Sequence, residues 1–157
     1  MDTLDLAGRP LTIRRAVRAD VPEVVALLSD DVLGREREDA DLGPYLAAFD
    51  RIEAQGGNEV IVVRDAAGTL LATLQLMLLP SLSRSGITRL QIEAVRVAAD
   101  ARGGGLGTAM LFWAHAWGRE RGARLVQLTT DVARTDARRF YENLGYVPSH
   151  VGLKREL

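Results

Sequence analysis

The chain has 157 residues, 47% of them hydrophobic and 26% charged, with a formal net charge of −1. This length and balance predict one folded domain over residues 1–157 and exclude disordered, coiled-coil and collagen-like chains. The absence of cysteine excludes disulfides and thiol nucleophiles, and with only two histidines we expect no metal centre. We expect a cytoplasmic protein without a membrane partner, because the sequence contains neither a signal-peptide pattern nor an apolar stretch of about 20 residues.

The charges divide unevenly along the chain. Residues 1–95 carry 15 acidic residues against 10 arginines, whereas residues 96–157 carry 10 basic residues against 6 acidic ones. A basic half suits an anionic ligand and an acidic half suits a cationic one, although a solvated surface has the same pattern. No basic run with interleaved aromatic residues occurs, so we expect no nucleic-acid partner.

The hydrophobic pattern predicts strands alternating with helices, which indicates an α/β (α+β) sheet with helices on its faces. Asp20 precedes the first helix and Glu23 follows three residues later, so we expect Asp20 to cap that helix. Two neighbouring strands turn at residues 65–68 and form a hairpin. The expected strands are 11–15, 59–64, 70–79, 88–97, 125–130 and terminal strands near 146–151, and the expected helices are 21–28, 46–54, 106–121 and 136–143.

A glycine-rich turn joins strand 88–97 to the helix that follows it. It reads Arg102-Gly103-Gly104-Gly105-Leu106-Gly107-Thr108. Glycines let successive N–H groups turn toward one point, and the helix N-terminus adds unpaired donors and a positive dipole end, so the turn suits a phosphate. Arg102 and the Thr108 hydroxyl would add a charge and a donor. A tight turn needs glycine for geometry alone, so a purely structural turn is the alternative.

Two nucleotide-binding motifs can be tested by spacing. A Walker A loop needs Lys and then Ser or Thr after its last glycine, but Thr108 follows Gly107 directly and Lys154 is the only lysine. A dinucleotide fingerprint needs glycine or alanine where Thr108 stands, although Asp131 ends the next strand as that motif expects. The Walker motif is therefore excluded, and a nucleotide-binding regulatory domain stays a weaker alternative.

The motif Arg102-x-x-Gly105-x-Gly107 resembles the Arg/Gln-x-x-Gly-x-Gly/Ala signature of the GNAT superfamily of acyl-CoA-dependent N-acyltransferases. Residues 92–97 resemble the fourth strand of that family, and residues 140–146 resemble its Tyr-x-x-x-Gly-aromatic segment. The element order also fits over essentially the whole chain, with residues 1–60 matching in pattern only. The resemblance implies a mixed, largely antiparallel GNAT-like sheet of about six to seven strands flanked by helices on both faces.

The resemblance also implies an N-acetyltransferase with acetyl-CoA as co-substrate. Its acceptor would be a primary amine of a small molecule, peptide or protein, attacking directly in a ternary complex. The alternative is a catalytically silent acyl-CoA-binding or sensing module. In the family, the backbone at a splay between two strands pairs with the pantetheine arm and the glycine turn holds the pyrophosphate. The implied cofactor-binding residues are Val95, Arg96, Val97, Arg102, Gly103, Gly104, Gly105, Leu106, Gly107 and Thr108.

Two side chains are candidates for the proton transfers that the reaction needs. Amines are mostly protonated at pH 7, so a base is required, and Glu93 on the fourth strand matches the family position that acts through water. Tyr141 matches the family tyrosine that protonates the departing CoA sulfur. The alternatives are an ordinary strand carboxylate and a packing tyrosine. Arg134 stands where relatives often have Asn, and it either reaches a CoA phosphate or lies in solvent.

The acceptor and the assembly are less strongly indicated. The acidic stretch 30–41 occupies the place where the family builds its acceptor wall, so Glu36, Glu38 and Asp39 suggest a cationic amine. The family often forms homodimers through terminal strands or helices, and the apolar residues between 147 and 157 permit a homodimer here.

Overall fold

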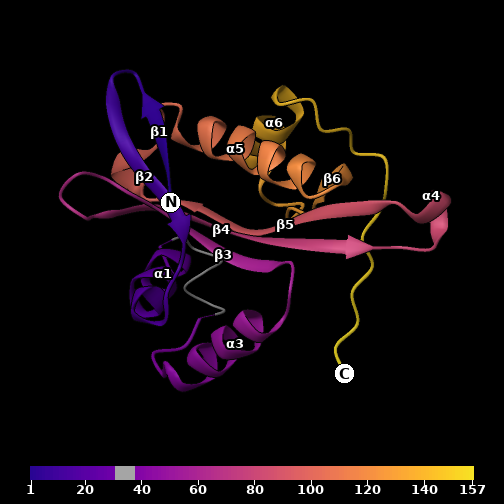
Figure 1. The fold of residues 1–157 in the computed structure, drawn as a ribbon, viewed down its shortest axis with the longest axis horizontal. Coiled ribbons are helices and arrows are strands. Elements are labelled where there is room, and N and C mark those ends of the chain that lie inside the picture. The colour runs from indigo at the N-terminus through magenta and orange to yellow at the C-terminus, as the bar shows by residue number, and fades with distance from the viewer. Residues whose placement is uncertain (31–37) are drawn as a thin grey trace.

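The computed structural model describes residues 1–30 and 38–157. These residues form a sheet of six strands in which chain neighbours lie side by side, in the order β1 to β6 (Figure 1). Neighbouring strands from β1 to β5 are antiparallel, and β5 and β6 are parallel. The strands are β1 (Asp2–Leu6), β2 (Arg9–Arg15), β3 (Asn58–Arg64), β4 (Leu70–Pro80), β5 (Thr88–Val97) and β6 (Ala123–Leu128).

Helices cover both faces of the sheet, which confirms the expected fold class. In Figure 1, α1 (Val21–Leu28) and α3 (Gly43–Ala54) lie below the sheet, and α5 (Leu106–Glu120) and α6 (Thr135–Asn143) lie above it. Three single-turn helices complete the described elements: η1 (Arg18–Asp20), α4 (Ser83–Gly86) and η2 (Ala99–Ala101). No helix in the described part of the chain has the length and apolar character that a membrane span requires.

Alternating side chains of the strands divide the interior into two cores. Ile61 and Val63 of β3 pack with the buried face of α5, whereas Val62 packs with α1 and α3. On α5 the expected apolar stripe is buried at Leu106 and Met110. Burying one such side chain stabilises the fold by about 1.5–3 kcal/mol, so the sheet is a rigid support for the loops at its edge.

Asp20 lies at the start of α1 but does not cap that helix with its side chain, contrary to expectation. Its carboxylate accepts the Val17 N–H at 2.7 Å and pairs with Arg14 at 2.7 Å and Arg64 at 2.8 Å. Burial alone raises the pKa of Asp20, but the hydrogen bonds from Arg14, Val17 and Arg64 outweigh it and lower the pKa to about 2. One carboxylate therefore ties β2, β3 and the start of α1 together.

The structure differs from the expectation near both termini. The hydrophobic pattern did not predict β1, a five-residue strand whose hairpin turn is held by the Gly8 N–H, which donates to Asp5 Oδ1 at 2.8 Å. The terminal strands expected near 146–151 are absent, and Val147 and Val151 are exposed. Pro148 gives a physical reason, because proline removes a backbone donor that a strand ladder needs.

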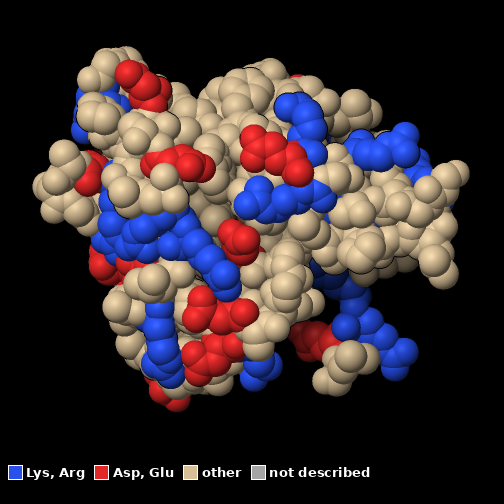
Figure 2. Space-filling model, in the orientation of Figure 1, with Lys and Arg blue, Asp and Glu red and all other residues tan. Residues whose placement is uncertain are grey.

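On the face that Figure 2 shows, charges of the two signs are mixed. Figure 2 shows basic and acidic groups close together across the middle of the molecule. Exposed pairs such as Arg18 with Asp50, 3.1 Å apart, and Arg15 with Glu53, 3.2 Å apart, contribute to this mixing. A charged ligand would therefore meet local groups on this face and not a long-range field.

Candidate functional site

Strand β5 carries a β-bulge at Ala94 and Val95. Gln75 of β4 pairs with Glu93, and Thr73 pairs with Arg96, so one residue of β4 faces two residues of β5. Ala94 adopts a positive φ of 52°, in the left-handed region that non-glycine residues rarely occupy. Strain of this kind persists where surrounding structure enforces it and gathers at functional sites.

The ladder between the parallel strands β5 and β6 ends where the bulge begins. Its last pair is Ile92 with Leu128, while β5 continues to Val97. Beyond Ile92, the edge of β5 therefore has no β6 partner, and the chain after β6 turns away toward α6. The sequence resemblance implies a splay of this kind around Val95 and Val97, and their pairing with the pantetheine arm stays a prediction.

Glu93 lies at the end of a chain of side-chain hydrogen bonds across the sheet. Gln91 Nε2 donates to Glu93 Oε1 at 2.7 Å, and Gln127 Nε2 of β6 donates to Gln91 Oε1 at 2.6 Å. Arg89 Nη1 donates to Gln127 Oε1 at 3.3 Å. Because arginine can only donate, it fixes the orientation of both glutamine amides, and each N–H then points toward the carboxylate.

This chain of bonds faces the side of the sheet that carries α1 and α3. Leu90 and Ile92 pack into the core under α5, and side chains alternate along a strand, so Gln91 and Glu93 face the opposite side. Gln91 is buried, with 8% of its surface exposed. A buried amide without a partner is costly, so the bond to Glu93 also satisfies Gln91.

Tyr141 approaches the opening from α6. Its ring contacts Phe140 and Tyr146, with centroids 5.3 and 5.8 Å away, and it packs against the core under α5. The Tyr146 hydroxyl lies 2.7 Å from His115 Nε2 on α5. Tyr141 is thus held by tilted and edge-to-face aromatic contacts that the sequence pattern did not identify.

Burial and three nearby charges act on the Tyr141 phenol. Burial raises the pKa of Tyr141, the Glu93 carboxylate raises it further, and the charges of Arg96 and Arg134 oppose the rise. The phenol therefore stays protonated at neutral pH and is able to donate a proton. The Glu93 carboxylate therefore lies within electrostatic range of the Tyr141 phenol.

The glycine turn is shaped to receive a phosphate group. Gly103 and Gly105 have φ of 79° and 83°, and Gly105 is the N-cap residue directly before the 15-residue helix α5. A Cβ at Gly104 would have no heavy atom within 4 Å, so the space over the turn is open, whereas one at Gly107 would come within 3.3 Å of Phe140. The Leu106 side chain is buried, which leaves only its backbone to meet a ligand. Open glycines at a long helix N-terminus fit the pyrophosphate of CoA.

The arginines of the site contact the backbone of β5. Arg96 Nη1 donates to the Val95 carbonyl and Arg102 Nε donates to the Val97 carbonyl, both at 2.9 Å. Arg102 also lies 3.6 Å from Asp30. Arg134 is partly exposed before α6, and its charge lowers the pKa of Tyr141, so both alternatives for it stay predictions.

The acidic stretch 30–41 is described only in part. Glu36 lies outside the described residues. Glu38 accepts a hydrogen bond from the Tyr45 hydroxyl at 2.8 Å, and Asp39 accepts one from the Asp41 N–H at 3.0 Å. The described acids thus hold the start of α3, and their attraction for a cationic acceptor stays a prediction. Among the described residues, no group of three or more His, Asp or Glu side chains is arranged to hold a metal ion.

A sequence model of the acetyltransferase (GNAT) family matches residues 24–146 of the chain. The chain therefore belongs to the acetyltransferase (GNAT) family. This confirms, at the level of the family, the expected class of acetyl-CoA-dependent acyltransferases and the resemblance seen in the glycine turn.

The chain is also similar to individual proteins of known sequence or structure. Over 67 residues the chain is 37% identical to an aminoalkylphosphonate N-acetyltransferase of Salmonella typhimurium, a match that spans 43% of this chain and 44% of that curated relative. A transcriptional regulator from Bacillus halodurans has a crystal structure with 42% identity and a TM-score of 0.88, over 94% of this chain and 99% of that chain. An acetyltransferase of Trypanosoma brucei, with 24% identity and a TM-score of 0.77 over 94% of this chain and 99% of its own, shares the fold.

Proposed function

We propose that the protein transfers the acetyl group of acetyl-CoA to a primary amine of a small molecule. The observation that carries this proposal is the end of the β5–β6 ladder at Ile92, directly before Glu93, which Gln91 holds at 2.7 Å. Tyr141 of α6 packs against the same core as Val95 of β5, and burial keeps its phenol protonated. A module that only bound acyl-CoA would need neither group. The pair supports a catalyst over the silent alternative.

The proposed reaction assigns two proton transfers to side chains. Glu93 takes a proton from the ammonium group, directly or through one water, and the free amine attacks the thioester carbonyl. The C–S bond then breaks, and Tyr141 gives its proton to the departing CoA sulfur. The nitrogen releases its surplus proton through water, which leaves the neutral amide and restores the Tyr141 phenol. The chain of Gln91, Gln127 and Arg89 holds the carboxylate in one orientation.

The proposed donor site runs from β5 to the start of α5. The backbone of Val95, Arg96 and Val97 pairs with the pantetheine arm, and an N–H of this strand polarises the thioester carbonyl. The N–H groups of residues 103–108 hold the pyrophosphate, with Arg102 adding charge and Thr108 a hydroxyl. The left-handed glycines and the open space over Gly104 support this assignment.

We also propose that the chain is one catalytic domain that works as a homodimer. Strand β6 is an edge of the sheet, and edge strands invite pairing with another chain. Val147, Val151 and Leu153 are exposed on a terminal segment that forms no helix or strand. Sedimentation velocity would test this, with a dimer expected for the full chain and a monomer when Val151 and Leu153 are replaced by Asp.

The experiment that tests the catalytic proposal compares Tyr141→Phe with the wild type by thiol release and by calorimetric titration of acetyl-CoA. Loss of a general acid typically lowers kcat by about 10²- to 10⁴-fold. The dissociation constant of acetyl-CoA should stay within about twofold. Glu142→Gln, at an exposed position beside Tyr141 on α6, is the matched control and should keep wild-type turnover. Unchanged turnover in Tyr141→Phe would refute the proposed acid.

A further inference from the structure

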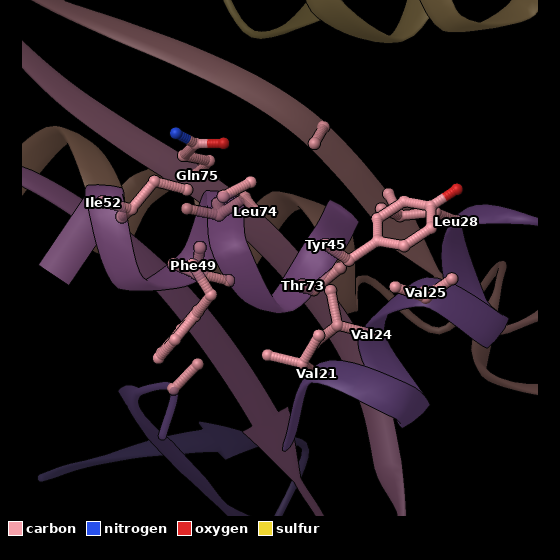
Figure 3. A pocket seen from close by; sticks show the side chains of 14 residues that line it. Val21, Val24, Val25, Leu28, Tyr45, Phe49, Ile52, Thr73, Leu74 and Gln75 are labelled. Carbon is pink, nitrogen blue, oxygen red and sulfur yellow. The ribbon is translucent and has the colours of Figure 1, made fainter. Parts of the chain in front are cut away.

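An apolar cavity of about 170 Å³ lies between the sheet and the two helices below it (Figure 3). Val25 and Leu28 of α1 and Phe49 and Ile52 of α3 line it, and Figure 3 shows these side chains converging from the two helices. It belongs to the face of the sheet toward which Glu93 points.

The cavity adjoins the proposed catalytic base. Ala94, the strained residue of the bulge, lines it and follows Glu93 directly in the chain. Gln75 also lines it and pairs with Glu93 across the β4–β5 ladder. A molecule with its nitrogen at Glu93 therefore has this cavity beside it.

The polar groups in the cavity wall are already engaged. Thr73 Oγ1 donates to the Ile61 carbonyl at 2.8 Å, and Gln75 Nε2 donates to Asn58 Oδ1 at 2.9 Å. The Tyr45 hydroxyl donates to Glu38. A charged or strongly polar group entering the cavity would lose its hydration without gaining these donors, which is unfavourable.

From these observations we propose that the cavity receives the apolar body of the acceptor, which is an alkylamine or arylalkylamine with a hydrophobic group about the size of a phenyl ring. An apolar cavity of about 150 Å³ in another protein binds benzene, so this volume suits six to eight carbon atoms. The inference rests on the proposed function, because it places the amino nitrogen at Glu93. Such an amine is a cation in water, which agrees with the acidic residues of segment 30–41.

This proposal separates the chain from its relative that is named for aminoalkylphosphonates. A phosphonate is an anion and needs hydrogen-bond donors or a cation. The cavity wall instead consists mainly of aliphatic and aromatic side chains, which provide neither. We therefore expect 2-aminoethylphosphonate to be a poor acceptor here.

The first experiment measures kcat/KM for ethylamine, butylamine, hexylamine, 2-phenylethylamine and 2-aminoethylphosphonate at saturating acetyl-CoA. Each buried methylene should raise kcat/KM about fourfold, which gives about 250-fold from ethylamine to hexylamine. A flat series, or 2-aminoethylphosphonate as the best acceptor, would overturn the inference while leaving acetyl transfer to amines in place.

The second experiment fills the cavity. Ala48 lines it from α3, and its neighbour Ala47 is exposed on the same helix. Ala48→Leu should lower kcat/KM for hexylamine at least tenfold and change the value for ethylamine less than twofold. Ala47→Leu is the matched control and should behave as the wild type. If kcat/KM depended on the length of the alkyl chain in the same way in Ala48→Leu and Ala47→Leu, the inference would be overturned.

A third measurement does not depend on turnover. 2-Phenylethanol has the ring but lacks the amine, and its binding can be followed by calorimetry in the wild type and in both variants. Saturable binding that only Ala48→Leu loses supports the cavity as the site for the ring, even if no amine is acetylated and the proposed activity fails. Absence of binding to the wild type would overturn the inference.

Discussion

The most quantitative prediction concerns Asp20, whose carboxylate joins β2, β3 and the start of α1. A group whose pKa is lower in the folded state than in the unfolded state stabilises the fold at pH values above its ordinary pKa. That stabilisation is lost as the pH falls through the folded-state pKa. For Asp20 these two values are 3.8 and about 2. The difference corresponds to about 2.5 kcal/mol of stability at neutral pH, of which about 1.1 kcal/mol disappears between pH 6 and pH 3.

The perturbation is Asp20→Asn, compared with the wild type by urea unfolding between pH 6 and pH 3. At pH 6 the variant should lose about 3 kcal/mol, because it leaves Arg14 and Arg64 without their shared partner. As the pH falls from 6 to 3, the wild type loses about 1.1 kcal/mol of the stability that Asp20 contributes, whereas the variant has no carboxylate at this position and loses none of it. The gap between them should therefore shrink by about 1 kcal/mol.

A matched variant separates this effect from general acid unfolding. Asp50 pairs with Arg18, but both side chains are more than half exposed, so Asp50→Asn should cost less than about 1 kcal/mol. A gap between Asp20→Asn and the wild type that stays constant from pH 6 to pH 3 would refute the argument. It would mean that folding does not lower the pKa of Asp20 from 3.8 to about 2.

Three further predictions concern the site. Gln91→Leu should lower kcat by about 10- to 100-fold, because it releases the Glu93 carboxylate from its fixed orientation, and it should leave the KM for acetyl-CoA unchanged. If Gln91 were only structural, steady-state kinetics would show a change in the KM for acetyl-CoA as large as the change in kcat. Ala94→Gly should raise the free energy of unfolding by about 1 kcal/mol in denaturant titrations by relieving the left-handed backbone, and an unchanged midpoint would contradict the strain. Gly105→Ala should destabilise by about 1 kcal/mol and weaken acetyl-CoA binding in calorimetry, whereas the same change at Gly104, where the backbone is not left-handed, should leave stability nearly unchanged.

Most elements were predictable because they are encoded locally. The helix of α5 follows its glycine turn and carries an apolar stripe, and the turn at residues 65–68 between two apolar runs marks the hairpin of β3 and β4. The misses have physical causes that the pattern does not contain. The strand β1 is short and is held in part by the Trp113 indole of α5, which donates to Asp2 at 3.0 Å from 111 residues away. The terminal strands do not form, although Val147 and Val151 are apolar.

The position of Asp20 before α1 was predicted correctly, but its predicted role as the side-chain cap of that helix was wrong. A carboxylate before a helix with Glu23 three residues on is typical of a capping box. In the folded chain, Arg64 lies within reach of Asp20 from 44 residues away, and a charged partner binds a carboxylate more strongly than a helix N–H group does. The distant pair decided what the side chain contacts.

The candidate site divides in the same way. The sequence by itself determined the glycine turn, the strand with Glu93 and the helix with Tyr141, because each depends on residue types at short spacing. Tertiary structure decided that the charge of Glu93 acts on Tyr141, that Gln127 reaches Gln91 from 36 residues away, and that α1 and α3 enclose an apolar cavity beside the bulge. Local sequence sets backbone conformation, whereas contacts between distant residues depend on how the sheet pairs and which helices cover it.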